Sequence, residues 1–380
     1  MSLSGGNGVL RITGRSRKRL VIKVGTNTLT AGGEGLHRPQ MQEIVRQVSQ
    51  LVRAGHQVAV VSSGAIVAGR EALHIMKNGK DIPFKQVLAA VGQARLMQAW
   101  DQLFSGHGVT IAQTLLTRAD LADRQGYLNA RNTLLALLDR DVVPIINEND
   151  VVAVEEIKIG DNDNLSALVA NLIDADLLIL LTDQPGLYTA DPRRNAGATL
   201  IKEVTIITDE IIALAAGAGT ARGTGGMVTK IQAARLATES GVAVLVVGGT
   251  TENVLMRAVK GEAIGTRFPS SRTRLESRKR WILSGLAGPA AARIDEGAVA
   301  ALKRGRSLLP AGVVDVKGPF DRGDSVNIVG PHGEAVACGV VSYGAADLER
   351  IKGRRSAQIE QILGYHFGDE VIHRNNVVML

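Results

Sequence analysis

Short runs of consecutive apolar residues recur through the first two thirds of the chain, and stretches with apolar residues at helical spacing separate them. Such runs are typical of buried strands, and they lie at residues 20–24, 57–61, 109–113, 142–146, 177–181 and 242–247. Helices are predicted over residues 39–54, 85–104, 128–138 and 231–238, with two more that begin after residue 65 and near residue 165. Continuous apolar strands that alternate with helices indicate a parallel sheet covered on both faces. The pattern therefore predicts an α/β fold: an open, mainly parallel sheet sandwiched by helices.

The pattern changes in the last quarter of the chain. Residues 267–280 form a basic stretch rich in Arg and Ser, which suits a linker. Beyond it, short strands are predicted at residues 312–316, 325–329 and 334–341, with helical pieces at 297–304 and 345–351. This is the pattern of a small, mainly β domain. The predicted organisation is a flexible tail over residues 1–19, the α/β domain over 20–266, the linker over 267–280 and the second domain over 281–380.

The net charge of +7 does not sit on a folded face. Residues 1–20 hold five basic and no acidic residues, and residues 267–280 hold six basic and one acidic. Residues 281–380 hold eleven of each sign, which leaves a net charge of −3 for residues 21–266. Because non-specific nucleic-acid binding needs a basic patch, this distribution argues against it.

Three further features limit the class of protein to which the chain can belong. No apolar run reaches the roughly 20 residues that a membrane-spanning helix needs, so no membrane partner is expected. The single cysteine, Cys338, can form no internal disulfide, which suits a reducing cytoplasm, and we expect a cytoplasmic protein. The seven histidines show no zinc-site spacing, so no protein-held metal is predicted.

Polar residues follow four of the predicted strands. They are Thr26-Asn27, Ser62-Ser63, residues 147–150 and Thr182-Asp183. Since the carboxyl ends of parallel strands meet at one edge of a sheet, where such folds bind ligands, we expect these residues to lie together.

Residues 160–167 carry two carboxylates, two amides and a hydroxyl directly before an apolar run. Asp163 and Asn164 are predicted as N-cap residues of the helix that follows, whose first turn presents free N–H groups. Taken alone, the stretch is also consistent with a capped surface turn.

Three features suit phosphate binding: Lys23 beside the small residues 24–26, the glycine-rich residues 223–230 before a helix, and Gly248-Gly249 after the last strand. Glycines let backbone N–H groups approach phosphate oxygens, and lysine supplies a mobile charge. None of them has the spacing of a Walker A or Rossmann motif.

Together these residues suit phosphoryl transfer, which needs mainly alignment and charge neutralisation. Lys23 and Lys230 would flank the transferred group, and Asp163 would orient the lysines or a metal-bound nucleotide. A carboxylate acceptor is already ionised at pH 7 and needs no general base. The residues expected to hold the acceptor are Ser63, Asp150 and Asn162.

The order and spacing of these motifs resemble the glutamate 5-kinase family of the amino-acid kinase superfamily. The matching segments are residues 21–26, 61–65, 146–150, 158–167, 181–192 and 223–230. The chain from about residue 278 is similar to the PUA domain that many bacterial members carry. There the matching segments are residues 307–312 and 320–324.

The resemblance implies ATP- and Mg²⁺-dependent phosphorylation of the γ-carboxylate of L-glutamate to glutamyl 5-phosphate, the first step of proline biosynthesis. It also implies feedback inhibition by proline and a homo-oligomer, either a dimer or a tetramer. By position, Lys23, Lys230 and Asp163 would be catalytic, and Ser63, Asp150 and Asn162 would bind glutamate. The residues implied to bind ATP are Lys23, Thr182, Asp183, Thr224, Gly225, Gly226, Met227, Val228, Thr229 and Lys230. One departure is Asn27, where the family frequently has Ser.

Two alternatives stay open from the residues. The first is another amino-acid kinase, acting on aspartate, acetylglutamate or carbamate, although those usually show a Gly-Gly pair after the first lysine, whereas here Gly25 is followed by Thr26. The second is an RNA-binding protein that acts through the PUA-like domain. Residues 281–380 are charge-neutral and lack a cluster of basic and aromatic residues, so we do not favour RNA binding.

Overall fold

The computed structural model of the 380-residue chain describes residues 17–75, 81–153, 162–192, 194–216, 226–270, 276, 282 and 286–380. The chain divides into two compact units. The first comprises the chain up to Leu121 together with Ala130–Ser271, and the second comprises Ala122–Asn129 together with Arg272–Leu380. Among the residues just given, no helix is long and apolar enough to cross a membrane.

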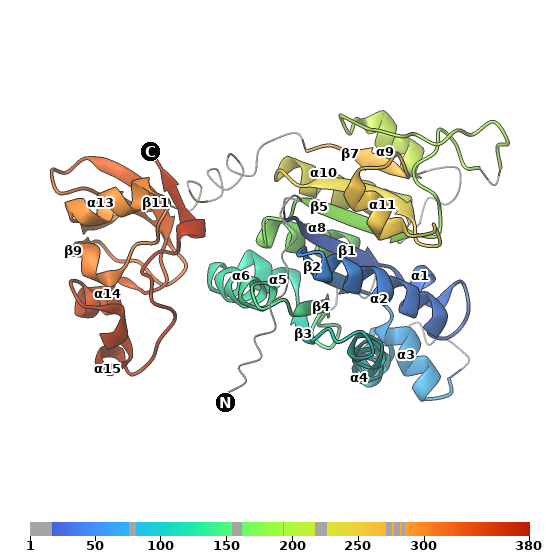
Figure 1. Cartoon of the computed structure of the whole chain (residues 1–380), viewed down its shortest axis with the longest axis horizontal. Helices are drawn as coiled ribbons and strands as arrows, with labels where there is room; N and C mark the ends of the chain where they lie inside the picture. Colours follow the sequence, from blue (N-terminus) through green and yellow to red (C-terminus); the bar gives the residue numbers. More distant parts are fainter. Residues whose placement is uncertain are drawn as a thin grey trace, which may run out of the picture. The chain divides into compact units, whose positions relative to one another are not determined.

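The first unit is built on a seven-stranded sheet in the order β3-β4-β2-β1-β5-β6-β7 (Figure 1). Every neighbouring pair is parallel except β6 and β7, which are antiparallel. The open, mainly parallel sheet is therefore confirmed. The strands are β1 (Arg19–Val24), β2 (Gln57–Ser62), β3 (Ile111–Leu116), β4 (Val143–Glu148), β5 (Leu177–Thr182), β6 (Ala243–Gly248) and β7 (Thr266–Phe268).

Three of these strands differ from the prediction. β3 covers Ile111–Leu116, whereas residues 109–113 were predicted. β4 continues beyond its apolar run, because Asn147 and Glu148 pair in register with Leu115 and Leu116 of β3. β7 was not predicted; it has three residues and begins at Thr266, one residue before the basic stretch. β7 is held in place by backbone pairing with β6, and it has no apolar run of its own.

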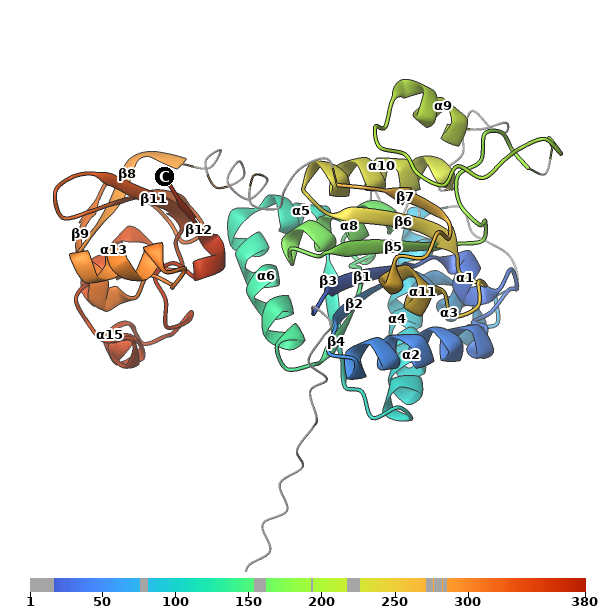
Figure 2. The same cartoon turned by 45° about the horizontal axis from the view of Figure 1, so that its top comes forward.

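Helices cover both faces of the sheet (Figure 2). On one face, α2 (Arg38–Arg53), α3 (Ala65–Ala72), α4 (Ile82–Ser105) and α11 (Val254–Lys260) share a core with alternate residues of five strands. On the other face, α8 (Asp163–Leu172) packs on β1 and β5, and α10 (Met227–Glu239) packs on β6 and α8. Other helices among the described residues of this part of the chain are α1 (Thr26–Thr30), α5 (Arg118–Ala122), α6 (Arg124–Leu138) and α9 (Asp209–Ala216).

The two helices that follow the polar loops begin earlier than predicted. The N-cap of α8 is Asn162, whose side chain makes no capping bond, and Asp163 is already the first helical residue. The predicted capping role of Asp163 and Asn164 was therefore wrong. α10 begins at Met227 because Gly226, at a φ of 123°, turns the chain sharply into the helix. Lys230 consequently lies in the first turn of α10.

Helices α3 and α4 touch through their backbones at two glycines. A Cβ atom added to Gly92 would lie 1.8 Å from the carbonyl oxygen of Ala65, and one added to Gly69 would lie 1.9 Å from that of Leu88. No larger residue fits at either position without moving a helix. This contact fixes α4 against the start of α3, directly after the loop that carries Ser63.

The second unit holds a five-stranded sheet in the order β12-β11-β10-β8-β9, in which only β8 and β10 are parallel. Its apolar core lies between this sheet and short helices. The small, mainly β domain is confirmed. Its elements are β8 (Leu286–Ile294), α13 (Glu296–Lys303), β9 (Val313–Lys317), β10 (Ser325–Val329), β11 (Ala335–Val340), α14 (Ala345–Ile351), α15 (Ile359–Leu363) and β12 (Val377–Met379).

Candidate active site

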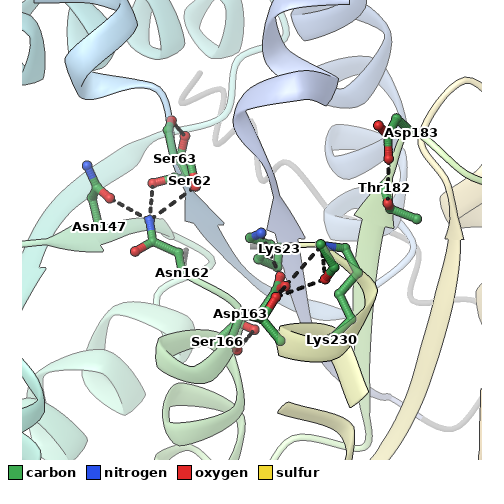
Figure 3. Close-up of polar contacts among 12 residues, drawn as sticks. Lys23, Ser62, Ser63, Asn147, Asn162, Asp163, Ser166, Thr182, Asp183 and Lys230 are labelled. Atoms are coloured by element: carbon green, nitrogen blue, oxygen red, sulfur yellow. Dashed lines mark hydrogen bonds and ion pairs between the residues drawn. The ribbon is translucent and has the colours of Figure 1, made fainter. Parts of the chain in front are cut away.

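Two lysines and one aspartate meet at the carboxyl end of β1. Lys23 Nζ lies 2.6 Å from Asp163 Oδ1, and Lys230 Nζ lies 3.0 Å from Asp163 Oδ2 (Figure 3). Asp163 is fully buried, and the two lysine side chains are 4% and 9% exposed. The cluster therefore holds two cations and one anion with little access to water. Its charge of +1 is unbalanced within these three side chains, so it favours an anionic ligand.

Three elements position this cluster. β1 is fully buried from Leu20 to Val24, and Lys23 stands among its apolar residues. Asp163 and Lys230 come from the first turns of α8 and α10, which pack together. A helix N-terminus carries a partial positive charge, so both helices add to the positive potential here.

Thr229 completes the contacts of the carboxylate. Its Oγ1 lies 2.9 Å from Asp163 Oδ2 and 2.9 Å from the carbonyl oxygen of Gly226. Thr229 was predicted to contact nucleotide, whereas these contacts tie the start of α10 to Asp163. Asp163 Oδ1 thus contacts the Lys23 ammonium group from β1, and Oδ2 accepts from Thr229 and Lys230 of α10.

A second group of polar side chains joins the carboxyl ends of β2 and β4 to the start of α8. The Asn162 Nδ2 donates to the carbonyl oxygen of Ser62 at 3.0 Å and to Asn147 Oδ1 at 2.7 Å, and it lies 3.4 Å from Ser63 Oγ (Figure 3). Asn147 in turn donates to Gln93 Oε1 of α4 at 2.8 Å. The predicted acceptor residues Ser63 and Asn162 therefore lie together.

The third predicted acceptor residue, Asp150, lies in the turn after β4 and is half-buried. Asn162 Nδ2 contacts Ser63 Oγ directly, and it also donates to Asn147 Oδ1. Asn147 was predicted only as part of a polar cluster, and Gln93 was not predicted at all. Asn147 carried a signal, its place at the end of a strand, whereas a single glutamine inside a long helix carries none.

A third polar group follows β5. Thr182 Oγ1 donates to Asp183 Oδ1 at 3.0 Å, and Asn27 Nδ2 donates to Asp183 Oδ2 at 3.3 Å. Asn27, the departure from the family pattern, thus links α1 to the turn after β5. Gly226, Met227, Val228, Thr229 and Lys230 lie at the start of α10, whereas the predicted residues Thr224 and Gly225 lie outside the described residues.

Comparisons with known proteins match both units. The model of the amino acid kinase family matches residues 18–248, and that of the PUA domain matches residues 291–363. The glutamate 5-kinase of Herpetosiphon aurantiacus is 56% identical over 361 residues, covering 95% of this chain and 98% of the relative. The chain belongs to the glutamate 5-kinase family.

Other members of this family match over similar lengths. The glutamate 5-kinase of Dehalococcoides mccartyi strain CBDB1 is 51% identical over 96% of this chain and 98% of its own, and that of Deinococcus radiodurans is 51% identical over 95% and 100%. A solved UMP kinase from Bacillus anthracis superposes with a TM-score of 0.48 at 15% identity, covering 68% of this chain and 98% of that chain. Family membership makes this protein an enzyme, a kinase with an attached PUA domain.

Proposed function

We propose that the protein transfers the γ-phosphoryl group of ATP to the γ-carboxylate of L-glutamate and so forms L-glutamyl 5-phosphate. The observation that carries this proposal is the buried Lys23–Asp163–Lys230 cluster, with its net charge of +1, beside the polar group around Asn162. The first suits a phosphoryl group and the second suits the polar end of an amino acid. The match to named glutamate 5-kinases along nearly the whole chain supports glutamate as the acceptor.

In this mechanism the chain aligns the reactants and neutralises charge. The transferred phosphoryl group carries negative charge on its three equatorial oxygens in the transition state. Lys23 and Lys230, held 2.6 Å and 3.0 Å from the oxygens of Asp163, would face that charge from two sides. Asp163 keeps the two ammonium groups in place and is itself not required as a base. The acceptor carboxylate, with an ordinary pKa of about 4.3, is already ionised at neutral pH.

On the acceptor side, Ser63, Asp150 and Asn162 would bind the amino-acid end of glutamate. The Ser63 hydroxyl group suits a carboxylate, and the Asp150 carboxylate and the Asn162 carbonyl oxygen suit an ammonium group. On the donor side, Thr182, Asp183 and the start of α10 would hold the nucleotide, because the N–H groups of a helix N-terminus favour phosphate.

Magnesium fits this site as an ion that arrives with the nucleotide. Within the described ranges, no group of three His, Cys, Asp or Glu side chains is placed to hold a metal. Both oxygens of Asp163 already contact lysine ammonium groups. Mg²⁺ in kinases is commonly bound by substrate phosphates with one or two carboxylates, and it screens the charge of the phosphates. The protein's contribution would then be to receive the metal–nucleotide pair.

The proposal extends to the place of the reaction and to its control. An acyl phosphate is a reactive product, and we propose that it feeds proline biosynthesis in the cytoplasm. Proline would inhibit by occupying the acceptor side, because its carboxylate and amine resemble those of glutamate. A homo-oligomeric state, dimer or tetramer, stays a prediction.

The test is ADP release with ATP, magnesium and L-glutamate, beside aspartate, acetylglutamate and no acceptor, each with and without proline. Hydroxylamine would trap the acyl phosphate as a hydroxamate. We expect glutamate-dependent turnover that proline suppresses. Turnover on another carboxylate but not on glutamate would refute the acceptor, and ADP release without hydroxamate would refute transfer to a carboxyl group.

A further inference from the structure

Three side-chain amides form a chain of hydrogen bonds from α4 to the start of α8. Gln93 Oε1 accepts from Asn147 Nδ2 at 2.8 Å, and Asn147 Oδ1 accepts from Asn162 Nδ2 at 2.7 Å. The chain ends at the carbonyl oxygen of Ser62, which accepts from Asn162 Nδ2 at 3.0 Å. It spans elements that are up to 100 residues apart in the sequence.

The backbone carbonyl fixes the direction of the whole chain. A carbonyl oxygen can only accept, so Asn162 must present its NH₂ group to Ser62. Asn147 must then turn its oxygen towards Asn162 and its NH₂ group towards α4. Gln93 is left with one role, that of an acceptor. The amide orientations therefore follow from chemistry and not from a choice between oxygen and nitrogen positions.

The orientation in which Gln93 accepts from Asn147 costs free energy, because it leaves the NH₂ group of Gln93 unpaired. Its Nε2 is buried, and among the described residues it has no hydrogen-bond partner. A buried donor without a partner destabilises a folded protein, so a retained one calls for an explanation. We explain the unpaired donor by the hydrogen bond that Gln93 accepts from Asn147. A residue that served stability alone would not leave a buried donor unpaired.

The position of Gln93 is rigid. It follows Gly92, whose missing side chain lets α4 touch the carbonyl group of Ala65 at the start of α3. The same helix pair is held again at Gly69 and Leu88. Gln93 is thus held at a fixed position relative to the loop that carries Ser63, and it can hold Asn147 in one orientation.

We propose that Gln93 is a positioning residue for the acceptor amino acid, which acts through Asn147 to fix the amide of Asn162. With its NH₂ group held by Ser62 and Asn147, Asn162 turns its carbonyl oxygen away from both, as Figure 3 shows. That oxygen is then the atom offered to the ammonium group of the acceptor. Without Gln93, Asn147 can rotate, and the NH₂ group of Asn162 loses one of the two acceptors that hold it against movement. This inference rests on the proposed function, in which glutamate is the acceptor.

The first test compares Gln93→Met with the unchanged protein. Methionine keeps the length of the side chain but removes the acceptor for Asn147. We expect the KM for glutamate to rise about tenfold, as for the loss of about 1.4 kcal/mol of binding, while the KM for ATP and the thermal midpoint stay within error. Gln102→Met, an exposed position on the same helix, is the matched control and should change neither KM.

Two further variants separate positioning from a general packing effect. In Gln93→Glu a carboxylate oxygen can still accept from Asn147, so the KM for glutamate should stay within about threefold of the unchanged protein, since the acceptor is kept. In an Asn147→Ala background, Gln93→Met should have little added effect, because the proposed path runs through Asn147. A full tenfold effect in that background would overturn the inference.

The remaining outcomes are also decisive. An unchanged KM for glutamate in Gln93→Met, or a parallel rise in both KM values with a lower thermal midpoint, would refute a positioning role. If the unchanged protein turns over no glutamate at all, the proposed function fails, and the inference as stated for glutamate falls with it. Glutamate turnover by the unchanged protein distinguishes failure of the proposed function from failure of the inference about Gln93.

Discussion

Replacement of Asp163 by asparagine tests the charge arrangement of the site most directly. The change keeps the size of the side chain and removes its negative charge. It leaves Lys23 and Lys230, whose side chains are 4% and 9% exposed, as two buried cations without their shared anion. Removal of one partner from a buried ion pair typically costs about 3–5 kcal/mol. For a domain of this size, about 1 kcal/mol shifts the thermal midpoint by about 2–4 °C, so we expect a fall of roughly 6–20 °C.

We also expect Asp163→Asn to lower the catalytic rate. Loss of one pre-organised group that stabilises transition-state charge typically lowers the rate by about 10²–10³-fold, and we expect kcat to fall by that amount with glutamate and ATP. Because a nucleotide would bring negative charge to the two lysines, ATP should recover part of the lost thermal stability. The assay is ADP release, run beside thermal unfolding with and without nucleotide.

Lys230→Met removes a positive charge from the cluster, whereas Asp163→Asn removes the negative one. It leaves Lys23 and Asp163 as a neutral pair, so it should lower kcat by a similar factor while the thermal midpoint falls far less than in Asp163→Asn. Lys260→Met, at an exposed position at the end of α11, is the control and should alter neither property. If Asp163→Asn proved as stable and as active as the unchanged protein, the idea that this carboxylate balances two charged lysines would be refuted.

Two other changes test the surroundings of the site, and a third tests the second unit. Gly92→Ala would place a Cβ atom 1.8 Å from the carbonyl oxygen of Ala65; we expect a loss of about 1–3 kcal/mol from overpacking, measured by denaturant unfolding, and a silent substitution would contradict the close contact of α3 and α4. Thr229→Val removes the hydroxyl group 2.9 Å from Asp163 Oδ2; steady-state kinetics should show a fall in kcat of about tenfold, from a loss of about 1–1.5 kcal/mol, which Thr229→Ser should largely restore. Tyr343 donates to one backbone carbonyl at 2.6 Å and accepts from a backbone N–H group at 2.9 Å, and burial raises the pKa of its hydroxyl group above 10.0. The stability that this raised pKa contributes is fully present below about pH 10 and is lost as the pH rises through the folded-state value. Tyr343→Phe should therefore weaken the alkaline fall in thermal midpoint of the full chain, and an unchanged pH dependence would rule this role out.

The sheet was predictable because its strands are continuous apolar runs, a pattern that few other structures share. The same reasoning missed β7, since a three-residue strand that contains Arg267 has no apolar run to recognise. It also ended β4 too early, because Asn147 and Glu148 are held in the sheet by backbone pairing with β3, which composition does not reveal.

The residues of the candidate site were predictable to a different degree on its two sides. Lys23, Asp163 and Lys230 were recognised from their motifs, and the structure places both lysine ammonium groups within 3.0 Å of the Asp163 carboxylate. The local interpretation of Asp163 as a helix cap failed, because ion pairing with two lysines competes with capping for the same carboxylate. Gln93 could not be predicted, since its role depends on how α4 crosses α3 and not on its neighbours in the sequence.

In the proposed mechanism, the strand order places the residues for the acceptor and those for the phosphoryl donor on two parts of the chain. β2, β4 and β3 lie on one side of β1 in the sheet and come from the first half of the chain that forms it. β5, β6 and β7 lie on the other side and come from the second half. Ser63 and Asn147 belong to the first half, and Thr182 and Lys230 belong to the second. The halves meet at two consecutive residues, Asn162 and Asp163, of which one joins the amide chain and the other joins the lysines. A change of acceptor could therefore arise within the first half while the machinery for the phosphoryl donor stays as it is.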